Sequence, residues 1–167
     1  MKILTIAIPS YNSMDYMRNC IESLLPGGED VEILIVDDGS KDDTPAIADE
    51  YQEKYPGIVR AIHQENGGHG EAVNAGLRNA TGFFYKVVDS DDWVDAESYQ
   101  KILAFLKEAM KEEEPLDMLL SNYVYEKVGA KHKKVIQYHS ILPENRYFGW
   151  DEIGHFHASQ NILMHSV

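Results

Sequence analysis

The chain has 167 residues, of which 44% are hydrophobic, which fits one globular domain, or most of one, and excludes a disordered chain. Its 28 acidic and 15 basic residues give a formal net charge of -13, which would repel polyanions and so excludes nucleic acid and anionic membranes as partners. Because Cys20 is the only cysteine and no apolar stretch reaches the roughly 20 residues of a membrane span, we expect a soluble, cytoplasmic chain without membrane contact of its own.

The first half of the sequence alternates short β-branched runs with longer amphipathic runs, which is typical of βαβ units and a mostly parallel sheet. Strands are predicted at residues 3–8, 31–36, 58–63 and 83–88. Their nearly continuous apolar character indicates strands that are covered on both faces. The sequence therefore predicts an α/β fold with three layers, α/β/α.

Helices are predicted between these strands, where apolar residues recur at helical spacing. The first helix shows Met14, Met17, Cys20, Ile21, Leu24 and Leu25, the second Ile47, Ala48 and Tyr51, and the third, which begins near Gly70, Val73 and Leu77. The run Pro26-Gly27-Gly28 is expected to end the first helix. Thr44 is expected to cap the second helix, with Pro45 at its first helical position.

The fourth predicted helix is longer and covers residues 95–113, with Asp95 as its N-cap. Its core face would consist of Tyr99, Ile102, Leu103, Leu106 and Met110. After Pro115 the pattern changes to two strand-like runs, residues 118–125 and 134–138, joined by a polar hairpin or loop. The last part is rich in aromatic residues and stops within an apolar run, so we expect the domain to continue beyond residue 167.

Polar residues follow all four predicted strands, as PSYNS, DDGS, QENGGHGE and DSDD. The carboxyl ends of parallel strands meet at one edge of the sheet, where ligands bind in open α/β folds. Each stretch taken alone has an ordinary structural explanation: Asn12 or Ser13 as a helix cap, Asp38-Gly39 as a turn and Gly67-Gly68 as a loop. Their coincidence at one edge favours a binding site.

The fourth stretch concentrates carboxylates. Two carboxylates held about 4 Å apart repel each other by roughly 4 kcal/mol at an effective dielectric constant of about 20. Asp89 and Asp91 could both approach one hard cation such as Mg²⁺ or Mn²⁺, which would remove this cost and keep positions open for substrate phosphates. Asp95 is interpreted as a helix cap, and a calcium loop does not fit because Trp93 takes the next ligand position.

The glycine-rich stretch at residues 66–71 permits close approach of the backbone to a ligand, and the following helix would direct its first N–H groups toward it. His69 and Asn74 would then face the ligand, although His69 has an equally good explanation as a plain loop histidine. The stretch is not a dinucleotide-binding fingerprint, since it does not follow the first strand and Val73 takes the place of the final small residue.

The stretches IPSYN, VDDGS, NGGHGEAVNAGLRNATG and DSDDW together resemble the nucleotide-sugar-binding half of the GT-A glycosyltransferases, in the large inverting family called family 2. The resemblance covers residues 3–95 in order and spacing. It implies a nucleoside-diphosphate-sugar donor, most often a UDP-sugar, bound with Mn²⁺ or Mg²⁺. It further implies that residues 1–114 bind this donor and that residues 115–167 begin the acceptor-side half of the same domain.

Site residues follow from the resemblance by position. Tyr11 would stack on the base, Asp38 would accept a hydrogen bond from it, and Asp89 would face the ribose or the sugar. Asp91, with Asp89 and Asp92, would hold the metal on the diphosphate. The donor-binding set is completed by Pro9, Asn12, Asn66, Gly67, His69, Asn74 and Ser90.

The implied reaction is the attack of an acceptor hydroxyl on the anomeric carbon, with inversion, and it needs a general base. The acceptor would be a saccharide or lipid-linked, and any membrane association would come through residues or partners outside this chain. The acidic pair Asp151-Glu152 is a weak candidate for the base, so none is assigned. His155, His157 and His165 could contribute to a metal site, but half-buried strand histidines explain them better.

Two alternatives remain open. The chain could be a nucleotide-sugar-binding module without turnover, because no base is assigned. It could also be a Mg²⁺-dependent nucleotidyl or phosphoryl transferase, which would need a cationic cradle for a triphosphate. The sequence has no glycine-rich loop followed by Lys-Ser/Thr, and Lys86 and Arg78 are the cations near the acidic cluster.

Overall fold

The computed structural model describes residues 1–114, 116–126, 133–138 and 142–152. The chain forms two compact units, Met1–Leu116 and Asp117–Val167. The predictions for His155, His157, His165 and the apolar run 162–164 concern residues outside those that the structure describes. No helix among the described residues is long and apolar enough to span a membrane.

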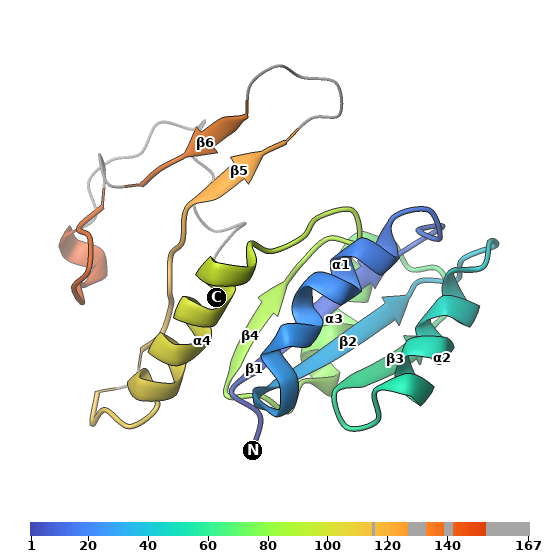
Figure 1. Cartoon of the computed structure of the whole chain (residues 1–167), viewed down its shortest axis with the longest axis horizontal. Coiled ribbons are helices and arrows are strands. Elements are labelled where there is room, and N and C mark those ends of the chain that lie inside the picture. The colour runs from blue at the N-terminus through green and yellow to red at the C-terminus, as the bar shows by residue number, and fades with distance from the viewer. Residues whose placement is uncertain (115, 127–132, 139–141, 153–167) are drawn as a thin grey trace. The chain divides into compact units, whose positions relative to one another are not determined.

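The first unit is built on a four-stranded parallel sheet in the order β3-β2-β1-β4 (Figure 1). Its strands are β1 (Leu4–Ser10), β2 (Val31–Asp37), β3 (Val59–His63) and β4 (Phe84–Val87). The parallel pairing and the four predicted strands are confirmed. Every residue of β1 and β2 is buried, whereas β3 and β4 are buried only at their first residue because they lie at the sheet edges.

Helices cover both faces of this sheet, which confirms the three-layer α/β/α prediction. They are α1 (Met17–Leu24), α2 (Thr44–Lys54), α3 (His69–Asn79) and α4 (Ala96–Ala109), with a short 3-10 helix η1 (Leu25–Asp30) after α1. Right-handed crossovers place α1 and α2 on one face, and α3 on the other because β4 lies beyond β1. Figure 1 shows α1 and α3 on opposite sides of the sheet.

The first helix begins later than predicted. Met14 is 42% exposed and lies before α1, because the Ser13 carbonyl accepts hydrogen bonds from the backbone N–H groups of Tyr16 and Met17 and so closes a turn there. The α-helix ends at Leu24, one residue earlier than the apolar pattern indicated, and Pro26 and Gly27 lie within η1.

The start of α2 also differs, since Thr44 is the first helical residue and Asp43 takes the N-cap position. The Thr44 hydroxyl accepts a hydrogen bond at 2.7 Å from the backbone N–H of Ser13. This contact joins residues that lie 31 positions apart. The threonine therefore connects the two loops that follow β1 and β2.

The core face of α3 was predicted wrongly. Ala72, Ala75 and Gly76 are its buried residues, and Leu77 is 56% exposed. A Cβ atom on Gly76 would lie 2.6 Å from the Cβ of Ala7 in β1. The helix therefore lies so close to the sheet that only small side chains fit between them, and the larger residues turn outward.

Helix α4 confirms the prediction for Asp95, whose Oδ1 accepts a hydrogen bond at 2.9 Å from the Ser98 backbone N–H. Three of the five predicted core residues are buried, namely Tyr99, Leu103 and Leu106, while Ile102 and Met110 are half-buried. The Tyr99 hydroxyl donates a 3.2 Å hydrogen bond to the carbonyl of Leu24. Helix α4 thus packs beside α1 and η1 and ends at Ala109, earlier than predicted.

In the second unit, β5 (Tyr123–Tyr125) pairs antiparallel with β6 (Lys134–Ile136), as expected for the two strand-like runs. Its small apolar cluster consists of Tyr138, Leu142, Leu120, Tyr123, Ile136 and Phe148. A short 3-10 helix, η2 (Trp150–Glu152), follows. Phe148 packs in this cluster, whereas Tyr147 is 57% exposed.

Candidate functional site

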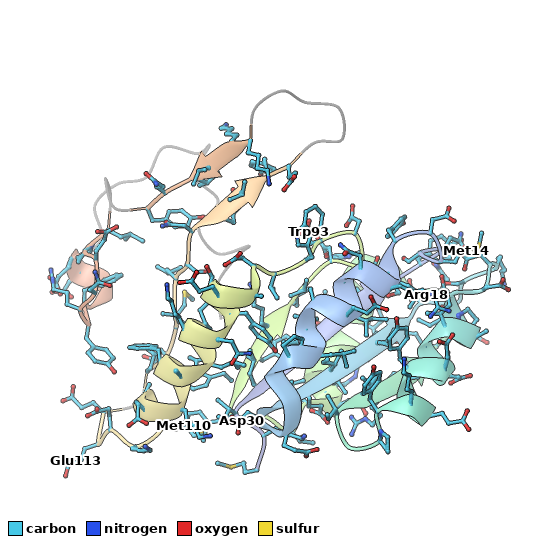
Figure 2. The ribbon with its side chains drawn as sticks, in the orientation of Figure 1. Met14, Arg18, Asp30, Trp93, Met110 and Glu113 are labelled. Carbon is cyan, nitrogen blue, oxygen red and sulfur yellow. The ribbon has the colours of Figure 1, made fainter. Side chains whose placement is uncertain are left out.

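The candidate site lies at the carboxyl edge of the parallel sheet, where the loops after all four strands come together. Figure 2 shows Met14 in the loop after β1 and Trp93 in the loop after β4, both at this edge. Asp30, at the other end of β2, lies at the opposite edge in the same view. The prediction that the four polar stretches share one edge follows from the parallel pairing of the strands.

Asp38, directly after β2, orders the glycine-rich loop. Its Oδ1 accepts hydrogen bonds from Gln64 Nε2 at 2.7 Å and from the Gly67 N–H at 2.9 Å, and its Oδ2 accepts one from the Gly68 N–H at 2.8 Å. Burial acts to raise the pKa of Asp38, but these hydrogen bonds outweigh it and hold the pKa below its ordinary value. A buried carboxylate therefore holds residues 64–68 in place.

Asn66, another member of the predicted donor set, and Gly39 also belong to this network. Asn66 donates a 2.9 Å hydrogen bond from Nδ2 to the Asp38 carbonyl. Gly39, in the turn after Asp38, has φ +71°, and a Cβ there would lie 2.8 Å from the Asn66 nitrogen. The close approach of the two loops thus depends on a glycine at this position.

The loop after β1 is tied to the loop after β2 through Asn12. Asn12 has φ +51°, its N–H donates to Ser40 Oγ at 3.0 Å, and its Oδ1 accepts from the Lys41 N–H at 2.8 Å. Tyr11, beside it, is 50% exposed, while Pro9 is buried within β1. The loop therefore presents the tyrosine ring to solvent on a fixed backbone.

The glycine-rich loop reaches the acidic loop after β4. His69 Nε2 lies 3.8 Å from Asp89 Oδ1, and both side chains are at least half exposed, at 66% and 50%. Asn74, one turn further along α3, is also exposed, and hydrogen bonds from Arg78 and then Asn74 lower the pKa of Glu71. The predicted neighbours His69 and Asp89 are thus brought together across two loops.

Hydrogen bonds hold the acidic loop against α1 and the loop that precedes it. Ser90, a predicted donor residue, is buried and its hydroxyl lies 2.8 Å from the hydroxyl of Ser13. The Cys20 thiol donates to the Asp89 carbonyl at 3.6 Å, and the Val94 N–H donates to Ser23 Oγ at 3.2 Å. Burial first, and then the nearby aspartates, raise the pKa of Cys20 to about 12, so the thiol stays protonated and acts as a donor.

The carboxylates of the acidic loop are exposed at Asp89, Asp91 and Asp92. Among the residues that the structure describes, no three His, Cys, Asp or Glu side chains converge into a metal-binding group. Exposed carboxylates two residues apart in one loop still fit a hard cation, because Mg²⁺ and Mn²⁺ sites often use one or two carboxylates together with water and substrate phosphates. The predicted ligands would therefore need the diphosphate to complete a site.

Two charged side chains near this edge have a role that the sequence analysis missed. His63, the last residue of β3, lies 3.1 Å from Asp37 Oδ2 through Nδ1 and 3.1 Å from Asp49 Oδ1 through Nε2. Burial acts to lower the pKa of His63, and the two aspartates raise it above its ordinary value. Lys86 in β4 was considered only as a nearby cation, and it is half-buried. The contacts of His63 leave no sequence signal, because they depend on which elements are neighbours in the fold.

The weak candidate for a general base lies in the second unit. Glu152 accepts a hydrogen bond from Arg146 at 2.6 Å and another from the Gly149 N–H at 3.2 Å. The bond from Arg146, followed by that from Gly149, lowers the pKa of Glu152. A carboxylate stabilised in its charged form is a weaker base, which disfavours this residue for proton abstraction.

A separate groove of about 450 Å³ lies between α1 and α2. Its lining consists of Met14, Asp15, Arg18, Asp43, Ala46, Ile47 and Glu50. Arg18, labelled in Figure 2, donates two hydrogen bonds to Glu50 at 3.0 and 2.6 Å across it. The groove contains none of the predicted donor residues.

Sequence comparison places this arrangement among known proteins. The family model described as "Glycosyl transferase family 2" matches residues 5–164. The uncharacterized glycosyltransferase YibD of Escherichia coli (strain K12) is 41% identical over 106 residues, which are 63% of this chain and 30% of YibD. Chondroitin synthase of Escherichia coli is 39% identical over 102 residues, 60% of this chain and 15% of that protein. The chain spans about a third of the length of the curated relatives it matches.

Solved structures agree with the sequence match. TarS residues 1–349 of S. aureus superpose with a TM-score of 0.60 at 33% identity, over 72% of this chain and 35% of that chain. The same TarS segment in complex with UDP-GlcNAc gives a TM-score of 0.59 at 33% identity, over 72% and 34% of the two chains. The central parallel sheet and its helices therefore match the GT-A fold of TarS.

Proposed function

Because the chain belongs to glycosyltransferase family 2, we propose that it supplies the donor-binding part of an enzyme that transfers a sugar from a UDP-sugar to an acceptor hydroxyl with inversion. The observation that carries this proposal is the meeting of the glycine-rich loop, ordered by Asp38, with the acidic loop at His69 and Asp89. TarS, with a matching fold, has been solved with UDP-GlcNAc, which supports a uridine nucleotide as the donor.

The proposed roles follow from where each side chain lies. The exposed ring of Tyr11 on its fixed loop would stack on the base. Asp38 holds the backbone of Gly67 and Gly68, whose close approach would accommodate the ribose or the diphosphate. The buried hydroxyl of Ser90 would act through the loop backbone that it fastens, because its own oxygen is already bonded to Ser13.

Asp89 and Asp91 are the residues that would hold a divalent cation, Mn²⁺ or Mg²⁺. When bound, such a cation would compensate the charge of the departing diphosphate. The chain needs this compensation, because its formal net charge of -13 opposes the binding of an anionic donor. The acceptor, a saccharide or a lipid-linked hydroxyl, and the general base would belong to the acceptor-side part of the domain, which residues 115–167 begin.

The first test is a calorimetric titration of the chain with UDP, GDP and ADP, with and without Mn²⁺. We expect UDP to bind more tightly when Mn²⁺ is present and Asp91→Ala to remove this dependence on the metal, because the variant lacks the main proposed ligand. Asp30→Ala is the matched control, since Asp30 is a half-buried aspartate at the opposite edge whose partner is Lys107.

Tight binding of ADP or GDP but not UDP would contradict the proposed base specificity. Equal binding of UDP with and without Mn²⁺ would contradict the proposed metal dependence. Donor binding without hydrolysis or transfer of UDP-GlcNAc would leave the proposed donor site intact and place the general base outside residues 1–167.

A further inference from the structure

Lys86 is a half-buried cation in β4, three residues before the acidic loop begins at Asp89. It is the third residue of β4, and its neighbour Tyr85 sends its hydroxyl to the Val73 carbonyl of α3, at 2.9 Å. Because successive residues of a strand point to opposite faces of the sheet, Lys86 points to the face that carries α1. On that face it lies between Phe84 and Val88, both 6% exposed.

A hydrogen bond from α1 holds the acidic loop on the face of the sheet to which Lys86 points. Cys20 of α1 is fully buried and donates its thiol hydrogen to the carbonyl of Asp89. Burial lowers the pKa of Lys86, while the charges of Asp92 and Asp89 act to raise it. The charges of Asp92, Asp89 and Asp91 also act to raise the pKa of the Cys20 thiol. Lys86 and Cys20 therefore lie on the same face of the sheet, next to the loop that carries the two carboxylates.

The backbone of the loop brings Asp92 back next to Asp89. The Asp92 N–H donates a 2.9 Å hydrogen bond to the Asp89 carbonyl, which also accepts from Cys20. A tight turn thus closes between Asp89 and Asp92. Of the two charges, that of Asp92 has the larger effect on Lys86.

We propose that Lys86 is a positioning residue of the donor site, which holds Asp92 as its counter-ion and so leaves Asp89 and Asp91 to the cation on the diphosphate. This inference rests on the proposed function. It revises the expectation that Asp92 shares in binding the metal. The lysine and its counter-ion would fix the turn of the acidic loop before any ligand arrives.

The physical reason is the repulsion within the acidic loop. Three carboxylates in four residues repel one another and would spread apart if nothing compensated their charge. Lys86, which is held in a strand, would supply one fixed positive charge to this loop. The pair that it forms with Asp92 would tolerate partial burial, because each charge has a partner. Removing Asp92 alone would leave the half-buried charge of Lys86 without compensation, which costs more than removing both.

The experiment is a double-mutant cycle on the full chain, with Mn²⁺-dependent UDP binding measured by calorimetry. The variants are Lys86→Met, Asp92→Asn and the two together. We expect each single variant to weaken the metal-dependent affinity for UDP by about tenfold and the double variant to regain most of it, because the members of a coupled pair do not add. Lys86→Arg keeps the charge and is expected to bind within about threefold of the original chain.

Two controls separate positioning from a loss of fold. Lys101→Met removes an exposed α4 lysine that pairs with Glu97 at 2.6 Å, and it should leave binding unchanged. The ratio of UDP affinities with and without Mn²⁺ is compared at a temperature at which every variant is fully folded. A purely structural lysine would not change that ratio, whereas a positioning lysine would lower it.

The proposal is overturned if Lys86→Met binds UDP and Mn²⁺ like the original chain. It is also overturned if Asp92→Asn abolishes metal-dependent binding as fully as Asp91→Asn does and Lys86→Met does not relieve the loss, since Asp92 would then be a ligand. If the original chain binds no UDP at all, the proposed function is what fails. In that case urea denaturation of the original chain, the two single variants and the double variant tests the pair. Additive losses of stability in the double variant would overturn the pairing of Lys86 with Asp92, whereas a double variant more stable than the single variants would support it.

Discussion

Asp38 shows how one side chain connects the sheet to the ligand edge. It lies directly after a buried strand, and its two oxygens accept hydrogen bonds from three donors in a loop that begins 26 residues later. Hydrogen bonds to an ionised, buried acceptor are stronger than neutral ones. The charge of Asp38 is therefore needed to hold the glycine-rich loop next to Asp89.

Replacing Asp38 by asparagine tests this role. The amide group of Asp38→Asn would offer N–H donors to the N–H groups of Gly67 or Gly68, so at least one buried donor would lose its partner. We expect a loss of about 1–3 kcal/mol in the free energy of unfolding, measured by urea denaturation at pH 7. Asp43→Asn, an exposed aspartate, is the control, and equal effects in the two variants would contradict the proposed role of Asp38.

The lowered pKa of Asp38 also predicts how the stability of the chain depends on pH. The pKa of Asp38 is lowered in the folded chain, so this group contributes stability above its unfolded pKa, about 3.9. That contribution is lost as the pH falls from the unfolded value through the folded one, because the unfolded state takes up the proton first. When the pH is lowered from 5, the original chain should therefore lose more stability than Asp38→Asn.

At the scale of elements, the close packing of α3 on the sheet decides where the glycine-rich loop lies. The helix uses Ala72, Ala75 and Gly76 against β1 and β2. Small residues permit this close approach. His69, the first residue of the helix, then has its Nε2 3.8 Å from Asp89 Oδ1. The spacing of α3 from the sheet is thus a structural requirement of the candidate site.

Gly76→Ala tests this packing. Its Cβ would lie 2.6 Å from the Cβ of Ala7 and 2.8 Å from the Tyr85 hydroxyl, so the helix must shift, at an expected cost of about 1–3 kcal/mol in the free energy of unfolding. Gly70→Ala in the same helix meets nothing within 4 Å and should be neutral or slightly stabilising. The measurement is thermal and urea unfolding of both variants, and equal stability would contradict the close packing of α3.

At the scale of the whole molecule, the chain consists of two units, and the first contains every residue of the candidate donor site. Helix α4 completes the core of this unit, because Tyr99, Leu103 and Leu106 are buried and Tyr99 donates to the Leu24 carbonyl. A unit with its own core can fold alone. The donor site and the remaining part of the domain would then be separable.

We therefore expect residues 1–116 to fold without residues 117–167. The measurement is cooperative unfolding of the fragment, followed by circular dichroism, with a midpoint close to that of the full chain. A fragment of residues 1–95, which lacks α4, is the control and should not unfold cooperatively, because the apolar surface of α1 and η1 would be uncovered. Loss of cooperative folding in residues 1–116 would show that the two units depend on each other.

The sequence by itself determined the elements of the first unit and the edge at which the site lies. Continuous apolar runs predict buried strands, and the glycine-rich and acidic stretches that follow them are local patterns that survive any detail of packing. The N-cap role of Asp95 is equally local, since its partner Ser98 is three residues away. Such features depend on neighbours in the chain, which the sequence states directly.

The tertiary structure alone decided which residues that are far apart in the sequence contact one another. Leu77 is exposed and Gly76 buried because the distance of α3 from β1 admits only small side chains. Thr44 accepts a hydrogen bond from the Ser13 backbone in another loop rather than capping its own helix, and Lys86 is half-buried in β4. Periodicity and propensity describe one element at a time, whereas these contacts depend on which elements are neighbours in the sheet and how closely they pack.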